Sequence, residues 1–208
     1  MRPLPAADRR LVQIVDAALA DATRRSGHWL VCRPGCTQCC IGVFAINQLD
    51  ALRLQHGLAD LQRTDPARAA RVRERVDESA SRLACNFPGD PGTGVLRRDA
   101  ESLARFEDFA NDEPCPALDP ATGLCDLYSS RPLTCRSFGP PVHTQGGLGI
   151  CELCFQGASE REIAACELQV DPDGLESKIL RRIGSNPDEP VQTIVTFALS
   201  ASLNRGKV

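Results

Sequence analysis

Cysteine spacing is the feature that most limits what this chain of 208 residues can fold into. Of its eleven cysteines, seven fall in two tight groups that stand far apart in the sequence. The first group is Cys32, Cys36, Cys39 and Cys40, and the second is Cys115, Cys125 and Cys135. Thiolates held this densely repel one another unless a shared cation offsets their charge. We therefore expect the fold to gather these cysteines around a metal.

Charge and hydropathy exclude several other classes of protein. The net charge of −3 and the isoelectric point of about 5.7 predict no nucleic-acid partner and no anionic-membrane partner. No apolar run reaches membrane-spanning length, and the amino terminus lacks the apolar core of a signal peptide. We expect a cytoplasmic protein, in which disulfides are disfavoured and dense cysteines indicate metal or redox chemistry. An odd number of cysteines also argues against a complete disulfide framework.

Helical periodicity dominates the remainder of the chain. Apolar spacing and capping residues predict seven helical segments. Four of them lie at 5–26, from Asn47 to near Gly57, from Asp65 to about 83, and at 99–110. The other three start at Ser159, Asp171 and Pro190. The length suits one domain over 1–208, with a helical insertion at 47–110 and a helical carboxyl-terminal region at 158–204. The predicted fold class is a small, irregular, mainly α domain with a short β-hairpin, stapled by cysteine-ligated metal.

The second cysteine group carries local folding signals of its own. Residues 117–128 are expected to form a short β-hairpin around a turn rich in Asp, Pro and Gly. That hairpin would bring Cys115 and Cys125 near each other. Ser130 is a candidate cap for a following helical turn that presents Cys135 close to its N-terminus, where a thiolate is favoured.

The first cysteine group leaves two interpretations open. Cys36 and Cys39 have the two-residue spacing that lets one turn of chain aim two sulfurs at one ion, and Cys32 can fold back to the same centre. Adjacent side chains diverge on a helix and point oppositely on a strand. Cys39 and Cys40 therefore either serve two different centres, or one of them ligates while the other packs.

The other cysteines and the nearby arginine allow further hypotheses. Cys151 and Cys154 form a third pair with two-residue spacing. Cys85 and Cys166 fall on apolar faces of predicted helices, where we expect them to pack in the core. Arg131 could offset the charge of the neighbouring thiolates, or it could form a salt bridge with an aspartate of the hairpin. No catalytic triad, carboxylate pair or nucleotide-binding loop stands out, so enzymatic activity stays open.

The layout of the chain resembles the CxxCxxCC cysteine-cluster family, often called YkgJ-like, of zinc- or iron-chelating proteins. The resemblance extends to non-cysteine positions, namely Pro116 and Leu118, Gly123 and Tyr128, Arg131 and Pro132, and Arg136 and Phe138 around the second cysteine group. It covers residues 30–44 and 114–156. The resemblance implies metal chelation. It also implies a further ligand downstream, for which Cys154 fits best, while Cys151 has no sure counterpart, so the final ligand stays open.

The sequence thus predicts a metal-chelating cysteine-cluster protein. The expected metal ligands are Cys32, Cys36, Cys39, Cys40, Cys115, Cys125, Cys135, Cys154 and Cys151. Thiolates suit both an iron–sulfur cluster and Zn²⁺, and all-thiolate ligation beside a Cys-Pro pair favours the cluster. The alternative is an iron–sulfur-dependent enzyme or electron carrier that performs redox or group-transfer chemistry on a peptide or protein. Its protein or peptide partner is not identified by the sequence.

Overall fold

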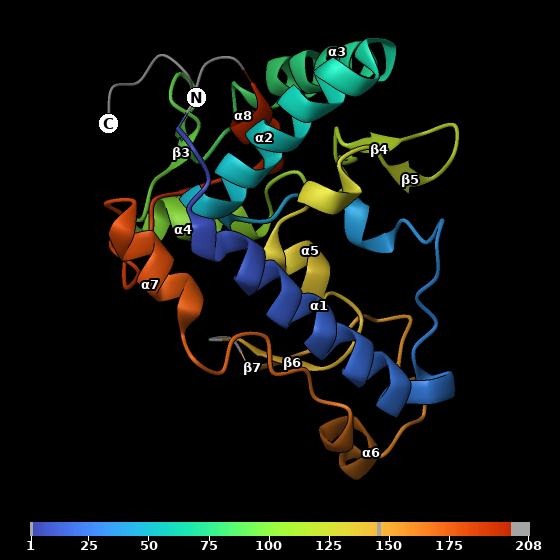
Figure 1. The fold of residues 1–208 in the computed structure, drawn as a ribbon. Coiled ribbons are helices and arrows are strands. Elements are labelled where there is room, and N and C mark those ends of the chain that lie inside the picture. Colours follow the sequence, from blue (N-terminus) through green and yellow to red (C-terminus); the bar gives the residue numbers. More distant parts are fainter. Residues whose placement is uncertain (1, 145–146, 201–208) are drawn as a thin grey trace.

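A computed structural model gives the structure of residues 2–144 and 147–200 (Figure 1). Helices and a few two-residue or three-residue strands make up this part of the chain, which confirms the mainly α expectation. The α-helices are α1 (Ala6–Ser26), α2 (Gln48–Thr64), α3 (Pro66–Leu83), α4 (Ala100–Glu107), α5 (Leu133–Ser137), α6 (Glu160–Ala165), α7 (Leu175–Arg182) and α8 (Val195–Leu199). Short 3-10 turns are η1 (Gly27–Trp29), η2 (Gln38–Cys40) and η3 (Tyr128–Ser130).

All strands of the described residues pair antiparallel, two by two. The pairs are β1 (Ile46–Asn47) with β8 (Gln192–Thr193), β2 (Gly89–Asp90) with β3 (Val95–Leu96), β4 (Leu118–Asp119) with β5 (Leu124–Cys125), and β6 (Val142–Thr144) with β7 (Gly147–Gly149). The last three are local hairpins, whereas the first joins the middle of the chain to its carboxyl-terminal part.

Apolar faces of the helices form two main cores. In the first, α2 and α3 lie against α8, and Leu54, Val72 and Ala198 are almost fully buried between them. In the second, α1 packs against α5 and α7, with Leu11 and Ile179 fully buried. After α1 the chain runs along one side of the molecule up to the β4–β5 hairpin (Figure 1). Within the described residues, no helix is both long enough and apolar enough to cross a bilayer.

The predicted helix starts are confirmed where a capping residue marked them. The Asn47 side chain accepts hydrogen bonds from the first backbone N–H groups of α2, and Asp65 does the same for α3. Ser159 begins α6 with a reciprocal capping box, as the sequence indicates. Caps satisfy N–H groups that a helix leaves without internal partners, so they fix where each helix begins.

Gly57 does not end α2, as the sequence suggested, because that helix continues to Thr64. A Cβ atom added at Gly57 would clash with the side chain of Ser130 in η3. The glycine therefore permits close packing of η3 on α2, and its role is steric. From sequence alone, a glycine in a helical pattern can mark the end of the helix or allow close packing within it. Here the contact with the distant Ser130 shows that the second interpretation is correct.

Two helix starts in the carboxyl-terminal part were placed too early. Asp171 is a cap as predicted, since its carboxylate accepts hydrogen bonds from the N–H groups of Leu175 and Glu176, but α7 begins only at Leu175. The helix expected from Pro190 starts at Val195, because residues 192–193 pair with β1 as strand β8. Residues 201–204 of the expected helical region lie outside the described residues.

The turn chemistry of the β4–β5 hairpin occurs twice in the chain. In both hairpins a threonine hydroxyl donates to the carboxylate of the aspartate three residues earlier, Asp90 or Asp119, at 2.9 Å. In both, the next glycine N–H donates to the backbone carbonyl of that aspartate. The strand register places Leu96 in the first hairpin where Cys125 stands in the second. The shared turn is therefore scaffolding, and only the second hairpin presents a sulfur.

A buried ion-pair network joins three helices beneath the second core. Arg53 of α2 is 3% exposed and pairs with Asp8 of α1, at 2.7 Å, and with Asp50 of its own helix. Asp50 also accepts a hydrogen bond of 2.9 Å from the N–H of Leu133, the first residue of α5. The expected cap, Ser130, lies outside this helix start, so Asp50 holds the N-terminus of α5 in its place.

We predict that Arg53→Met strongly destabilises the fold. The variant keeps an unbranched, flexible side chain but leaves two carboxylates buried without their cation, which typically costs about 3–5 kcal/mol. Chemical denaturation at neutral pH measures the free energy of unfolding. Arg63→Met is the matched control, because Arg63 lies on the same helix and pairs with Asp60 at the same spacing, but in solvent.

The control should change the free energy of unfolding by less than about 0.5 kcal/mol, as is usual for exposed pairs. Equal stabilities of Arg53→Met and Arg63→Met would show that the buried network does not hold these helices together.

Candidate metal centre

The fold sorts the nine predicted ligands into two groups of thiols. We define the inner group as Cys39, Cys40, Cys115, Cys125 and Cys135, and the outer group as Cys32, Cys36, Cys151 and Cys154. Electrostatic interactions with other members of the same group raise the thiol pKa values of Cys32, Cys40, Cys115, Cys135 and Cys151. The dividing line falls between Cys36 and Cys39, inside the first cysteine motif of the sequence.

Backbone pairing between two distant segments assembles the inner group. The N–H of Cys115 donates to the carbonyl of Cys40 at 2.7 Å, and the N–H of Gly42 donates to the carbonyl of Glu113 at 2.9 Å. Ile41 and Pro114 form an antiparallel bridge between these bonds. The doublet of the first motif therefore lies beside the second motif without any need for a bound metal.

The β4–β5 hairpin brings Cys125 to the same place, as the sequence predicts. Leu118 stands opposite Cys125 in the register, and the N–H of Leu118 donates to the carbonyl of Cys115 at 2.9 Å. The N–H of Asp126 donates to the carbonyl of Ala117 at 2.7 Å. These bonds place Cys125 close enough to Cys115 to raise the pKa of the Cys115 thiol.

Helix α5 carries Cys135, the third cysteine of this segment. Burial raises the pKa of its thiol well above the ordinary range, and the nearby Cys115 and Cys125 raise it further. Asp50, which accepts the N–H of Leu133, thereby positions this cysteine against the others. Nothing in the local sequence reveals that the Asp50 carboxylate is buried beneath a second helix.

The Cys39–Cys40 doublet lies entirely in the inner group and shares a hydrogen bond. That hydrogen bond from Cys40 is the main reason why the pKa of Cys39 falls to about 6, and the charge of Arg131 lowers it further. The same bond, with burial and the neighbouring thiols, raises the pKa of Cys40 far above its usual value. These opposite directions favour the thiolate on Cys39 and the proton on Cys40.

Arg131 supplies a buried positive charge beside the inner group. Its guanidinium carbon lies 3.8 Å from the ring centroid of Tyr128, and the residue is 9% exposed. Its charge counters the effect of burial on the thiol pKa of both Cys39 and Cys125. The hairpin residue Asp126 pairs instead with Arg68 and Arg75 of α3. Of the two roles considered for Arg131, charge offset is the one the contacts support.

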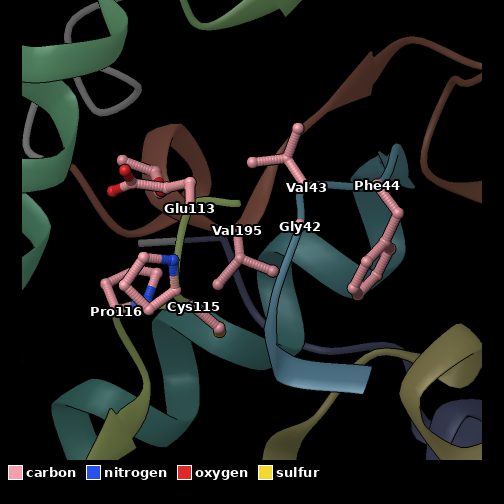
Figure 2. Close-up of a pocket in the computed structure, with 9 residues that line it drawn as sticks. Gly42, Val43, Phe44, Glu113, Cys115, Pro116 and Val195 are labelled. Atoms are coloured by element: carbon pink, nitrogen blue, oxygen red, sulfur yellow. The ribbon is translucent and has the colours of Figure 1, made fainter. Parts of the chain in front are cut away.

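The surroundings of Cys115 are apolar and enclosed. A small pocket beside it is shown in Figure 2, and its lining includes Gly42, Val43, Phe44, Pro116 and Val195. Burial in these surroundings raises the thiol pKa of Cys115 to about 12. Such a thiol stays protonated at neutral pH unless a cation replaces its proton. The inner group thus combines one ready thiolate with thiols that require a positive partner to ionise.

The outer group joins the end of α1 to the chain before α6. The sulfur atoms of Cys32 and Cys154 are 4.0 Å apart, which is about twice the length of a disulfide bond. Burial, together with Cys154, raises the pKa of Cys32 to about 12. Cys151 and Cys154 both belong to this group, so the structure brings together the two residues between which the sequence left the final ligand open.

The two remaining cysteines stand apart from both groups. Cys166 is 4% exposed and packs in a small cluster with Phe155, as expected of a core residue. Cys85 is exposed, so its predicted core position is wrong. It follows α3 at a turn, where the helical apolar stripe no longer faces the core.

In this structure the sulfur atoms of the two groups do not fully converge on a common point. Among residues 2–144 and 147–200, no three His, Cys, Asp or Glu side chains lie close enough together to enclose an ion. Ion binding would therefore require the thiols of a group to close by side-chain rotation about a common point.

Comparison with known proteins identifies one family. The family model CxxCxxCC, described as a putative zinc- or iron-chelating domain, matches residues 31–154. That range is more than half of the chain and contains both cysteine groups. No curated protein and no solved structure gives a significant match.

We predict that Cys39 is the first cysteine of the metal-free protein to react as pH rises. Its pKa of about 6 means that the thiolate persists above that pH and is lost below it. Iodoacetamide labelling at increasing pH, read for each cysteine by peptide mass spectrometry, should give a midpoint near pH 6 for Cys39. The same residue in the denaturant-unfolded chain should titrate near the ordinary value of about 8.5.

Cys40→Ala is the matched variant for this measurement, because it removes the thiol that donates to Cys39. The midpoint of Cys39 should move upward in that variant. A midpoint that is the same in the folded chain, the unfolded chain and Cys40→Ala would contradict the shared-proton arrangement.

Proposed function

Because the chain belongs to the CxxCxxCC family, whose domain is described as zinc- or iron-chelating, we propose that the inner group binds an iron–sulfur cluster. The observation that carries this proposal is the gathering of five thiols from two distant segments at one place. Backbone hydrogen bonds hold those segments together. A set of thiols alone, with no other ligand type among them, is the usual environment of such clusters.

The electrostatics of the inner group favour a cluster with bound iron. Four thiolates bring four negative charges into a largely buried site, and their ionisation requires positive charge close by. The metal supplies most of that charge, and Arg131 adds a fixed, buried cation. Burial also limits access of water and oxidants to the sulfurs of a cluster, and it adjusts the reduction potential.

Three ligands would come from the second motif and the fourth from the doublet. Cys115, Cys125 and Cys135 are positioned by the hairpin and by α5. Of the doublet, we assign Cys39 as the ligand, since its thiolate is already favoured. Cys40 would then donate its S–H hydrogen bond to a ligand sulfur, and such bonds tune a metal site.

The chemistry that a cluster held by four thiolates would supply is one-electron transfer. The residues of this chain orient the sulfurs, exclude water and hold a proton on Cys40. The pocket beside Cys115 is too small and too apolar to define a substrate. The function proposed is therefore chelation of a cluster, with electron transfer as its simplest use.

The first test is the metal content of the full chain purified without oxygen. We expect a brown protein that contains iron and acid-labile sulfide in equal amounts and that bleaches with dithionite. Cys125→Ser should lose the iron and the colour, because it removes a ligand while nearly preserving size. Cys85→Ser is the control, since Cys85 is exposed and belongs to neither group. Circular dichroism verifies that both variants retain their helices.

Two results would change this conclusion. A colourless protein that carries zinc, and loses it in Cys125→Ser, would replace the cluster with zinc while keeping chelation by the inner group. Full retention of iron by Cys125→Ser and by Cys135→Ser would remove the inner group as the binding site.

A further inference from the structure

We propose that the outer group is a second and separate metal centre, in which Cys32, Cys36, Cys151 and Cys154 bind one Zn²⁺ ion in a tetrahedron of thiolates. The proposal goes beyond the function of the inner group and does not depend on which metal that group holds. It assigns Cys32 and Cys36 of the first cysteine motif to the zinc ion and leaves Cys39 and Cys40 with the inner group.

The sulfur separation within the outer group suits zinc. In a tetrahedral site with Zn–S bonds of about 2.3 Å, the sulfur atoms lie about 3.8 Å apart. Cys32 and Cys154 already stand at 4.0 Å, so one edge of the tetrahedron is nearly at its final length. Cys151 is hydrogen-bonded to Cys154, and Cys36 lies within electrostatic reach of both Cys32 and Cys151.

Both halves of the site have the chain spacing of zinc ligands. Cys151 and Cys154 are separated by two residues, and the N–H of Cys154 donates to the carbonyl of Cys151 at 2.9 Å to close a tight turn. Cys32 and Cys36 are separated by three residues around a turn in which the N–H of Cys36 donates to the carbonyl of Arg33 at 3.0 Å. Pairs of cysteines two to four residues apart are the usual elements of structural zinc sites.

Contacts outside the cysteines already hold the two halves together. The N–H of Phe155 donates to the carbonyl of Trp29 at 2.9 Å, and the side-chain amide of Gln38 donates to the carboxylate of Glu152. Preorganised chain reduces the ordering that ion binding requires. The backbone segments that carry the four thiols are thus already held side by side.

Gly139 makes room for the sulfur of Cys32. The backbone at Gly139 has φ +116°, and a Cβ atom added there would lie 2.9 Å from that sulfur. Any larger residue would push Cys32 away from the outer group. Cys32 is an exposed residue, but its sulfur contacts the backbone at Gly139 and lies 4.0 Å from the sulfur of Cys154.

The local core around the outer group is too small to be stable alone. Its four buried members are Cys151, Cys154, Phe155 and Cys166, so three of the four are cysteines. The inner group, in contrast, packs on the larger core formed by α2, α3 and α8. Segments with little apolar burial commonly depend on a metal or a disulfide for stability, and zinc binding supplies folding free energy directly. The ion would staple residues 29–36 to residues 150–156.

The test compares zinc and iron in variants of the full chain, purified anaerobically and analysed by mass spectrometry of the metals. Cys36→Ser and Cys154→Ser should each lose one zinc ion per chain and leave the metal of the inner group unchanged. Cys166→Ala is the matched control, because Cys166 lies in the same small cluster but outside the four thiols, and it should retain its zinc. Cys36→His should regain zinc, since imidazole is a normal fourth ligand.

A second readout covers the case in which a serine variant folds poorly. Hydrogen exchange should accelerate in residues 29–36 and 150–156 of Cys36→Ser, while the amides of α2, α3 and α8 stay protected. Cys125→Ser should show the converse for metals, losing the metal of the inner group and keeping the outer zinc. Failure of the iron–sulfur assignment would appear as a colourless wild type, with two zinc ions of which Cys36→Ser loses one.

Three results would overturn the second centre. Loss of all metal in both Cys36→Ser and Cys125→Ser would indicate one shared centre. Full retention of zinc in Cys36→Ser would show that Cys36 is not a ligand. A reduced wild-type chain that binds no Zn²⁺ beyond the metal of the inner group, when titrated with Zn²⁺ alone, would show that the outer thiols do not form a site.

Discussion

The antiparallel contact between residues 40–42 and 113–115 is the constraint on which the rest of the site depends. A hydrogen bond of 2.7 Å from the N–H of Cys115 to the carbonyl of Cys40 ties the two cysteine motifs at their centres. Everything between them, including α2, α3 and α4, forms a loop closed by this contact. Closing a long loop costs conformational entropy. The burial of α2 and α3 against α8 offsets that cost, so the helical core and the cysteine site support each other.

Residues that bind no metal determine where the sulfurs lie. Arg53 neutralises Asp50, and Asp50 holds the N-terminus of α5, which carries Cys135. The thiol group is therefore positioned by a buried ion pair as well as by its own chain. Burial would make such a pair costly if one partner were missing. The same physics acts inside the inner group, where the hydrogen bond within the doublet and the charge of Arg131 both lower the pKa of the Cys39 thiol.

Local signals predicted the elements of this fold, and distant contacts decided their limits. Capping residues such as Asn47 and Asp65 gave correct helix starts, because a cap acts within one turn of chain. Gly57 was misread as a helix end, because its role depends on Ser130. Residues 192–193 were expected in a helix because their strand partner lies far away at Ile46 and Asn47. Cysteine spacing likewise predicted metal ligation but could not show which thiols meet, since that requires the pairing of residues 40–42 with 113–115.

Division of one motif between two groups has a mechanical consequence. Only Thr37 and Gln38 separate Cys36 of the outer group from Cys39 of the inner group, and the N–H of Cys40 donates to the carbonyl of Thr37 at 2.8 Å. This 3-10 turn, Gln38–Cys40, is therefore the short connection between the two groups. An ion in the outer group would fix the near end of the turn and thereby restrict the doublet at its far end. The two proposed centres would account for the close spacing of the motif, because they would share this one short connection.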